Sequence, residues 1–312
     1  MPSYAVVVDT DMGPDDAIAL LAALASDRVD VVGVCTVTGC LDAVSAAQSA
    51  LRILGYARRL DIPVCVGCRR PLYGPPPSPA EDAVAKAGLS IPREAEPDRR
   101  HAAQFIVEAA REHPGDLTLL TMGPLTNVAV ALMLDEELPD RLRVSVSMLG
   151  CYGVTPYGVG NVASRLEFNA YSDPLAAKVY LLSGLDKRLI GLDVTQAPAA
   201  LFGEDDFREL EEVGGMGLLA ANMYREAPKP TPVHDPATVV YLIEPGIFRF
   251  RRLYVDIEVC GRISSGETIA DLREELPEWL REGAPAEVCV SMDGERYKEV
   301  LKGVLAAGGG ER

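Results

Sequence analysis

The chain alternates short apolar runs with helical patterns over most of its 312 residues, and this alternation limits its possible folds more than any other feature. The apolar runs are rich in Val, Leu and Ile and lack a regular polar alternation, which is typical of parallel strands that are covered on both faces. They predict strands at 4–9, 29–37, 62–67, 117–122, 142–149 and 188–194. The segments between them predict helices at 15–26, 42–57, 99–113, 124–134 and 173–183. The sequence therefore predicts an α/β fold with a mostly parallel central sheet, helices on both faces and right-handed crossovers.

The rest of the chain falls outside this alternation. Residues 70–98 are dense in Pro, Ala and Glu, and we expect a long loop with one short helix that acts as a lid over a ligand pocket rather than as a domain linker. Residues 204–226 predict a helix, and Trp279 is expected to be a packed or surface residue. The last part of the chain predicts strands at 252–261 and 286–293 and a helix at 294–306.

The chain is strongly acidic, with a net charge of −16 and a pI of about 4.7. Such a chain has no electrostatic attraction to nucleic acid or to an anionic membrane, so we expect neither as a partner. No apolar run reaches the roughly 18 residues of a membrane-spanning helix, and the N-terminus lacks the pattern of a secretory signal. The seven cysteines are an odd number, and Cys65 and Cys68 form a CxxC without the second pair that a zinc site needs. We therefore expect a cytoplasmic protein with free thiols.

Four aspartates stand close together in the segment AVVVDTDMGPDDAIALL, residues 5–21. Asp9 and Asp11 end the first predicted strand, a Gly-Pro turn follows, and Asp15 and Asp16 begin a helix. Carboxylates suit the unpaired N–H groups and the positive dipole end of a helix N-terminus, so Asp15 can be explained as a cap. That explanation does not extend to Asp9 and Asp11. Carboxylates that face each other at the edge of a parallel sheet repel unless a cation lies between them, so the cluster predicts a site for a hard divalent cation.

Three further segments place polar groups at predicted strand ends or helix starts. They are TMGPLTN (121–127), with a backbone carbonyl at Met122; GNVASRLEFNAYSDP (160–174), with Asn161, Glu167 and Asn169; and VHDPATVVYL (233–242), with His234 and Asp235. Each group alone has a structural explanation, such as a helix cap for Asp235 or a turn former for an Asn. Because ligands of open parallel sheets bind beyond the carboxyl ends of the strands, the groups together predict a pocket for a metal and a polyhydroxylated ligand.

The motifs DTDMGPDDAIAL, GPLTN, EFNAYSDPLAA and HDPATVVYL, in this order, resemble those of the inosine–uridine-type nucleoside hydrolases. The resemblance covers nearly the whole chain and includes the final VDIEVCG…GETIAD hairpin. It implies that residues 1–312 form a single domain with a Rossmann-like core. It also implies one Ca²⁺ per chain at the bottom of a pocket, hydrolysis of the N-glycosidic bond of ribonucleosides, and assembly into a homodimer or homotetramer.

The resemblance assigns a metal site and two catalytic groups. The implied calcium ligands are Asp11, Asp16, Asp235 and the backbone carbonyl of Met122. Asp11 is also the implied general base for the attacking water, and Asp9 supports the metal ligands from behind. His234 is implied to protonate the departing base, which an imidazole can do near neutral pH.

Four further residues are assigned to the sugar. By the same resemblance, Asp15 and Asn169 hold ribose hydroxyls, and Asn161 and Glu167 hold the 5′-hydroxyl end. A ribosyl group departs as an oxocarbenium-like species, and a wall of carboxylates stabilises its positive charge. The metal and ribose sides of the pocket therefore match the family pattern.

The side of the pocket that would face the nucleobase departs from that pattern. Cys40 stands where the family commonly has an Asn that reaches the ligand, and a thiol is a weak donor and acceptor. Cys40 therefore makes an altered substrate contact or is a small buried thiol. Residues 70–98 lack the His-Gly motif that relatives often carry there, and residues 152–160 form a longer insert. The histidines of the chain are His101, which we expect to be structural, His113 and His234. The preferred base is not predicted.

Three other functions fit some of these residues. A haloacid-dehalogenase-type phosphatase would use Asp9 as nucleophile and Asp11 as acid and base, but it leaves the EFN and HDP motifs unexplained. A non-catalytic homologue that binds calcium and ribose would keep the pocket without turnover. A ribohydrolase for a modified or unusual nucleoside would explain Cys40 and the missing loop histidine.

Overall fold

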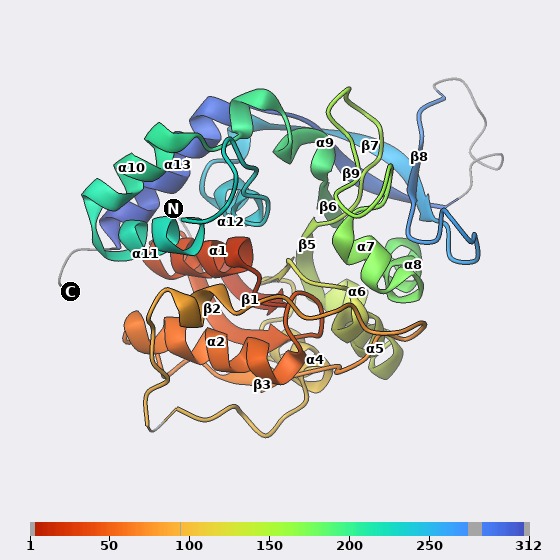
Figure 1. The fold of residues 1–312 in the computed structure, drawn as a ribbon. Helices are drawn as coiled ribbons and strands as arrows, with labels where there is room; N and C mark the ends of the chain where they lie inside the picture. The colour runs from red at the N-terminus through yellow and green to blue at the C-terminus, as the bar shows by residue number, and fades with distance from the viewer. Residues whose placement is uncertain (1–3, 94, 274–282, 309–312) are drawn as a thin grey trace.

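The computed structural model describes residues 4–93, 95–273 and 283–308, which form one central sheet with helices on both faces (Figure 1). The strands are β1 (Tyr4–Thr10), β2 (Val29–Thr36), β3 (Val64–Val66), β4 (Leu117–Thr121), β5 (Leu142–Met148), β6 (Lys187–Ile190), β7 (Phe248–Ile257), β8 (Thr268–Asp271) and β9 (Ala284–Met292). Within these ranges the strand order is β3-β2-β1-β4-β5-β6-β9-β7-β8. Neighbouring strands from β3 to β9 are parallel, whereas β7 is antiparallel to both β9 and β8. The predicted α/β class and mostly parallel sheet are confirmed.

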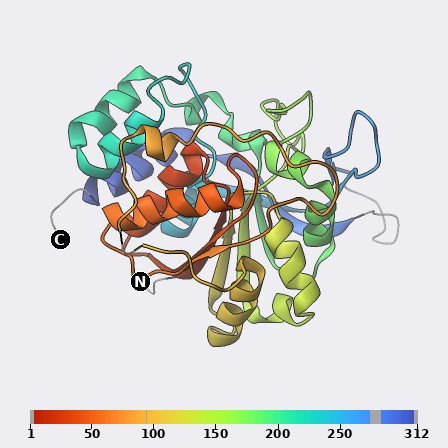
Figure 2. The ribbon, with the colours of Figure 1, turned by 60° about the horizontal axis from the view of Figure 1, so that its bottom comes forward.

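The helices cover the sheet in two layers (Figure 2). One layer holds α1 (Pro14–Ala25), α2 (Ala43–Tyr56), α11 (Gly215–Met223), α12 (Pro236–Ile243) and α13 (Gly294–Ala307), with α10 (Glu204–Val213) packed against α11 and α13. The other layer holds α4 (Ala102–Glu112), α5 (Thr126–Leu134) and α8 (Pro174–Leu182). Val6 and Val8 of β1 pack into the first layer and Val7 packs into the second. Both faces of this strand are therefore buried, which explains why its apolar residues do not alternate with polar ones.

Short helices complete the described chain. They are α3 (Ala83–Lys86), α6 (Leu138–Arg141), α7 (Phe168–Ser172), α9 (Leu192–Thr195), η1 (Pro198–Ala200) and η2 (Pro245–Ile247). None of the helices in the described ranges combines the length and the apolar composition that crossing a lipid bilayer requires.

Glycines explain two of the differences between the predicted and the observed elements. The strand predicted at 188–194 ends at Ile190, where Gly191 leads into α9. A Cβ on Gly191 would lie 2.7 Å from the carbonyl oxygen of Gly150, so only glycine permits this close approach. The helix predicted at 204–226 is divided into α10 and α11, because Gly214 and Gly215 have left-handed φ angles of 67° and 51°.

The predicted C-terminal hairpin is confirmed as β7 and β8. The strand predicted at 252–261 begins earlier, at Phe248, and ends at Ile257. Beyond Ile257, Glu258 accepts the backbone N–H groups of Cys260 and Gly261, which turns the chain out of the strand. Trp279 lies outside the described residues.

Within residues 70–93 and 95–98 the structure has one short helix, α3. The loop is attached to the first helical layer by the ion pair between Arg52 and Asp82, with 2.8 Å between nitrogen and oxygen. The N–H of Ala80 donates to the carbonyl oxygen of Cys40 at 2.6 Å. The loop is therefore anchored beside the predicted site, and its action as a lid stays a prediction.

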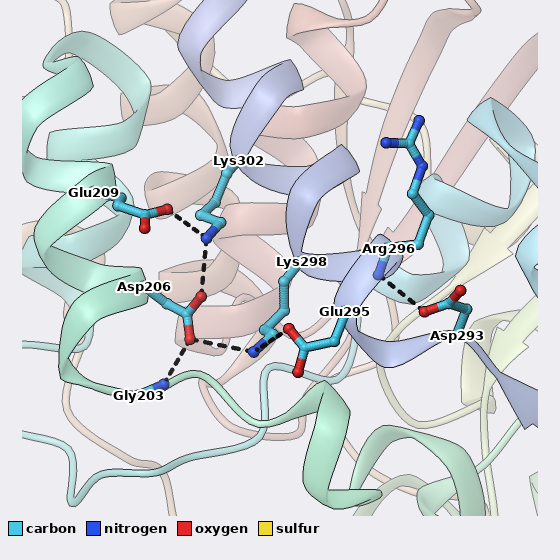
Figure 3. Close-up of polar contacts among 8 residues, drawn as sticks. All are labelled: Gly203, Asp206, Glu209, Asp293, Glu295, Arg296, Lys298 and Lys302. Atoms are coloured by element: carbon cyan, nitrogen blue, oxygen red, sulfur yellow. Dashed lines mark hydrogen bonds and ion pairs between the residues drawn. The ribbon is translucent and has the colours of Figure 1, made fainter.

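Helix α13 is fastened to α10 by a network of polar contacts (Figure 3). Asp206 accepts hydrogen bonds from Gly203 N and Lys302 Nζ, both at 2.9 Å, and Lys298 Nζ lies 3.5 Å from the same carboxylate. Glu209 accepts a second bond from Lys302 Nζ at 2.5 Å. Because several charges share partners and all but Glu209 are largely buried, this network holds the two helices together better than isolated surface pairs would.

Helix α13 in turn positions the segment that precedes α12. The buried hydroxyl of Tyr297 donates to the carbonyl oxygen of Val233 at 2.6 Å. Val233 directly precedes His234, a predicted site residue. The C-terminal helix therefore helps to fix the backbone on which His234 stands.

Candidate active site

The predicted site residues meet beyond the carboxyl ends of β1, β4 and β5, where the structure has a cavity of about 270 Å³. The lining residues are Asp11, Asp15, Asp16, Cys40, Met122, Met148, Asn161, Glu167, Phe168, Asn169, His234 and Asp235. Every residue predicted to touch a metal or a substrate belongs to this set. Met148 and Phe168 also line the cavity and were not predicted from the sequence.

The turn after β1 fixes the carboxylate of Asp16. Met12 has a φ of 56°, which is uncommon for a residue other than glycine, and its N–H donates to Thr10 Oγ1 at 3.0 Å. Asp16 accepts hydrogen bonds from Thr10 Oγ1 at 2.5 Å and from Gly13 N at 3.0 Å. The turn therefore holds Asp16 in the first turn of α1, where the positive end of the helix dipole favours a negative charge.

Three carboxylates of the cavity form a group that could hold a metal ion. Asp15, Asp16 and Asp235 each offer one oxygen, and these oxygens lie within 4.8 Å of one another. Asp235 occupies the N-cap position of α12, but its side chain makes no capping hydrogen bond, so a cap does not explain this carboxylate. Asp15, which the resemblance assigns to the ribose, belongs to this group as well. Oxygen donors of this kind suit Ca²⁺.

Burial and mutual repulsion make the carboxylates of Asp11, Asp16 and Asp235 hard to ionise without a cation. Burial raises the pKa of Asp11 to about 6, although its Oδ2 accepts a hydrogen bond from Cys40 N at 2.8 Å that opposes the shift. Burial, together with the charges of Asp11 and Asp15, raises the pKa of Asp16 well above its usual value. Burial, together with the charges of Asp15, Asp16 and Asp11, raises the pKa of Asp235 well above its usual value. A divalent cation would offset both effects, so the donor set fits the metal that the resemblance implies.

Asp9 lies behind the cavity and does not line it. Its Oδ1 accepts a hydrogen bond from Asn127 Nδ2 at 2.7 Å, and its buried Oδ2 has no hydrogen-bond partner among the residues that the structure describes. Burial raises the pKa of Asp9 to about 7. A carboxylate in this place cannot reach a phosphate ester in the cavity, which argues against the phosphatase that would use Asp9 as its nucleophile.

Asn127 joins the strand ends behind the cavity, a role that was not predicted from the sequence. Besides its bond to Asp9, its Nδ2 donates to the carbonyl oxygen of Thr36 at 3.1 Å, and its Oδ1 accepts from Cys68 N at 2.8 Å. These contacts join the ends of β1 and β2 to the segment after β3. Asn127 is the last residue of the GPLTN motif, and this position was the one feature of the sequence that pointed to such a role.

Glu167 is the N-cap of α7 and is saturated with backbone contacts. Its carboxylate accepts hydrogen bonds from three N–H groups, those of Gly150 at 3.0 Å, Asn169 at 2.8 Å and Ala170 at 3.0 Å. Burial raises its pKa in spite of these bonds. Glu167 therefore shapes this wall of the cavity, and its contact with the 5′ end of a sugar stays a prediction.

Asn169 joins two strand ends at the cavity. Its Nδ2 donates to the carbonyl oxygen of Met122 at 2.7 Å and to that of Met148 at 3.1 Å. A carbonyl oxygen has two lone pairs, so the Met122 carbonyl can accept this bond and still offer a ligand to a cation. Asn169 thus orients the carbonyl that was predicted as a metal ligand.

His234 is held by residues from two other elements. Its Nδ1 lies 2.7 Å from the hydroxyl of Thr195 at the end of α9, and its backbone N–H reaches Asp15 Oδ2 at 3.4 Å. Burial lowers the pKa of the imidazole, so the ring is mainly neutral at pH 7. Thr195 was not among the predicted site residues.

Cys40 lines the cavity as a half-buried residue with a neutral thiol. Burial, with the added charge of Asp11, raises the pKa of this thiol beyond its usual range, so it is not a nucleophile at neutral pH. The CxxC cysteines are free as well, and burial raises the pKa of both Cys65 and Cys68 to about 12. The prediction of free thiols is confirmed for all seven cysteines.

The insert at 152–160 is fastened to α9. The buried carboxylate of Asp193 accepts hydrogen bonds from Tyr152 N at 2.7 Å and from Val154 N at 2.8 Å. Asn161 follows the insert and lines the cavity although it is exposed to solvent. Helix α9 therefore contacts both this insert, through Asp193, and His234, through Thr195.

Comparison with known proteins identifies the family to which the chain belongs. The family model for inosine-uridine preferring nucleoside hydrolases matches residues 6–299. Uridine nucleosidase 1 of Arabidopsis thaliana is 30% identical over 319 residues, covering 96% of this chain and 92% of the relative. The inosine-uridine preferring nucleoside hydrolase of Leishmania major is 30% identical over 304 residues, covering 94% of each chain. A solved plant nucleoside hydrolase superposes with a TM-score of 0.86 at 28% identity, covering 98% of this chain and 99% of the other. The chain therefore belongs to the inosine–uridine preferring nucleoside hydrolase family and is a hydrolase of N-glycosyl bonds.

Proposed function

We propose that this enzyme hydrolyses the N-glycosidic bond of ribonucleosides to free base and ribose, with Ca²⁺ as its metal. The main observation in support of this proposal is that Asp11, Asp16, Asp235 and His234 all line the same cavity. Ribosyl transfer to water passes through an oxocarbenium-like state, in which positive charge develops on the sugar. Carboxylates fixed in a buried cavity stabilise that charge, because they need no reorganisation when it appears.

The proposed metal site uses oxygen donors from three parts of the chain. Asp11, Asp16, Asp235 and the backbone carbonyl of Met122 would hold the ion. The grouping with Asp15 supports two of these donors, because the carboxylates of Asp15, Asp16 and Asp235 lie within 4.8 Å of one another. When bound, the ion supplies electrostatic activation of water and a fixed point for two ribose hydroxyls. Asp9 would stabilise the site from behind through its bond to Asn127.

The remaining roles belong to the protein's own side chains. Asp11 takes the proton from the attacking water as general base. His234 donates its ring N–H to the departing base and stabilises the negative charge that develops there. The proposed sugar contacts are Asp15 and Asn169 at the ribose hydroxyls and Asn161 and Glu167 at the 5′ end.

A modified or unusual nucleoside is the second candidate substrate. It is favoured by Cys40, a weakly polar residue in the cavity where relatives commonly have Asn. The expectation of a cytoplasmic homodimer or homotetramer rests on the sequence alone and remains part of the proposal.

A panel of nucleosides tests the proposed function. We expect release of reducing sugar from at least one of inosine, guanosine, adenosine, uridine and cytidine, and loss of that activity in EDTA with recovery on adding Ca²⁺. The 2′-deoxy analogues should react far more slowly, because they lack a hydroxyl that the proposed metal holds. Tight binding of ribose with calcium, but no cleavage of any common or modified nucleoside, would instead identify a non-catalytic binding protein.

The His234→Ala variant tests whether His234 assists the departure of the base. We expect kcat for natural nucleosides to fall by roughly 100-fold or more, because general acid catalysis contributes on this scale. An activated substrate, p-nitrophenyl riboside, should be cleaved almost normally, since its leaving group needs no proton. The matched control is His113→Ala, which removes an imidazole outside the cavity. Equal losses on both substrates would show that His234 does not assist the leaving group.

A further inference from the structure

Helix α9 ends in the buried residue Thr195, whose hydroxyl lies near two possible hydrogen-bond acceptors. Thr195 Oγ1 lies 2.7 Å from His234 Nδ1 and 3.4 Å from the carbonyl oxygen of Gly191. A threonine in a helix ordinarily bonds back to the carbonyl four residues earlier, which here is Gly191. That carbonyl already accepts backbone N–H groups from Val194 at 3.2 Å and from Thr195 at 3.4 Å. The hydroxyl therefore makes its short contact with a residue 39 positions away.

The hydroxyl proton decides which ring nitrogen of His234 carries a hydrogen. If Thr195 donates to Nδ1, the neutral ring must carry its hydrogen on Nε2. If the ring instead carries its hydrogen on Nδ1, Thr195 has to accept it and turn its own proton towards Gly191 O, at the longer distance of 3.4 Å. The shorter contact favours the first arrangement. Nε2 has no hydrogen-bond partner among the described residues, so its hydrogen is available to a ligand.

We propose that Thr195 is a positioning residue that fixes the orientation and tautomer of His234, so that Nε2–H points to the departing base. The proposal rests on the proposed role of His234 in assisting the leaving group. It holds for both protonation states of the ring. In the neutral ring the threonine donates to Nδ1, and in the protonated ring it accepts from Nδ1–H, so Nε2 keeps its hydrogen in either case.

The structure also explains why α9 is a firm support for this contact. Asp193, two residues earlier on the same helix, binds the backbone N–H groups of Tyr152 and Val154 with its buried carboxylate. The backbone of α9 is thereby attached to the segment that leads to Asn161, a lining residue of the cavity. A rigid support of this kind is what a group that orients a catalytic imidazole requires.

The kinetic test compares Thr195→Val with Thr195→Ser. The Val variant keeps the shape but loses the hydroxyl, and we expect kcat for inosine and uridine to fall roughly 10- to 100-fold, the usual loss when an orienting partner is removed. KM should change little, and cleavage of p-nitrophenyl riboside should stay near the wild-type rate. The Ser variant keeps the hydroxyl and should restore most of the activity. An equal loss on natural and activated substrates, or no rescue by Ser, would overturn the proposal.

Nitrogen-15 NMR gives a readout that does not depend on turnover. The chain has three histidines, so a histidine-labelled sample gives a simple spectrum, and His234→Ala assigns the relevant ring. In the wild type we expect a protonated Nε2 with an unprotonated Nδ1, and in Thr195→Val a mixture of tautomers. An unchanged spectrum in Thr195→Val would overturn the proposal. If the Val variant fails to fold, Thr195→Ala provides the same comparison without a methyl group against Nδ1.

The two proposals fail in different ways. If His234→Ala shows no preference between natural and activated substrates, the proposed role of His234 is wrong, whatever Thr195 does. If His234→Ala shows that preference but Thr195→Val behaves as the wild type on all substrates and in the NMR spectrum, only the role of Thr195 is wrong.

Discussion

The Asp11→Asn variant is expected to lose ribonucleoside hydrolysis by roughly 10²- to 10⁴-fold in kcat, the range that a general base contributes. Asparagine has the same shape, and its Oδ1 can still accept the N–H of Cys40, which Asp11 now accepts at 2.8 Å. The variant should therefore fold normally. It loses the basic oxygen for the attacking water and one negative charge of the proposed calcium site.

The loss is checked by steady-state kinetics at saturating calcium, and calcium affinity by calorimetry. The matched control is Asp30→Asn, which removes the same charge from an exposed position of β2. Its kcat should equal that of the wild type. Activity of Asp11→Asn near the wild-type level would remove Asp11 from the mechanism, whereas a loss that excess calcium repairs would show that Asp11 is only a metal ligand.

The fold could be predicted largely from the sequence, because each buried strand had to be apolar on both faces. Val6, Val7 and Val8 show this directly, since they pack alternately into opposite layers. The errors arose where local conformation depends on glycine. Gly191 ends β6 because the carbonyl of Gly150 lies against it, and no residue near it in sequence reveals that contact. The break between α10 and α11 at Gly214 and Gly215 was hidden in an otherwise helical pattern.

The composition of the cavity could also be predicted, since the acidic and amide residues stand at strand ends that a parallel sheet brings together. What could not be predicted were the contacts between distant segments. Thr195 stands 39 residues from His234, and Asn127 stands 118 residues from Asp9. Neither partner has a residue type that suggests a site by itself. Glu167 shows the opposite problem, because a carboxylate assigned to the sugar also caps α7.

Without calcium, the stability of the protein is expected to fall as the pH rises from about 5 to about 8. The buried carboxyl groups of Asp9 and Asp11 have pKa values raised to about 7 and about 6, above the ordinary value of 3.8, mainly by burial. The folded protein therefore binds more protons than the unfolded chain in this range, so unfolding becomes easier as the pH increases. The stability that these groups contribute is complete below about pH 4 and is lost as the pH passes through 6 and 7.

Calcium should reverse this dependence, because the ion competes with protons for the same carboxylates. At a calcium concentration 100 times the Kd, the expected gain is about 2.7 kcal/mol, or about 5 °C in Tm, and it should shrink towards zero near pH 5. Thermal unfolding in EDTA and in calcium at several pH values, at constant ionic strength, measures both effects. Asp16→Asn should be more stable than the wild type in EDTA at pH 8, because one buried charge is removed, and calcium should stabilise it little. A wild-type Tm in EDTA that rises over this pH range, or an equal calcium effect on Asp16→Asn and Asp30→Asn, would contradict the proposed metal site.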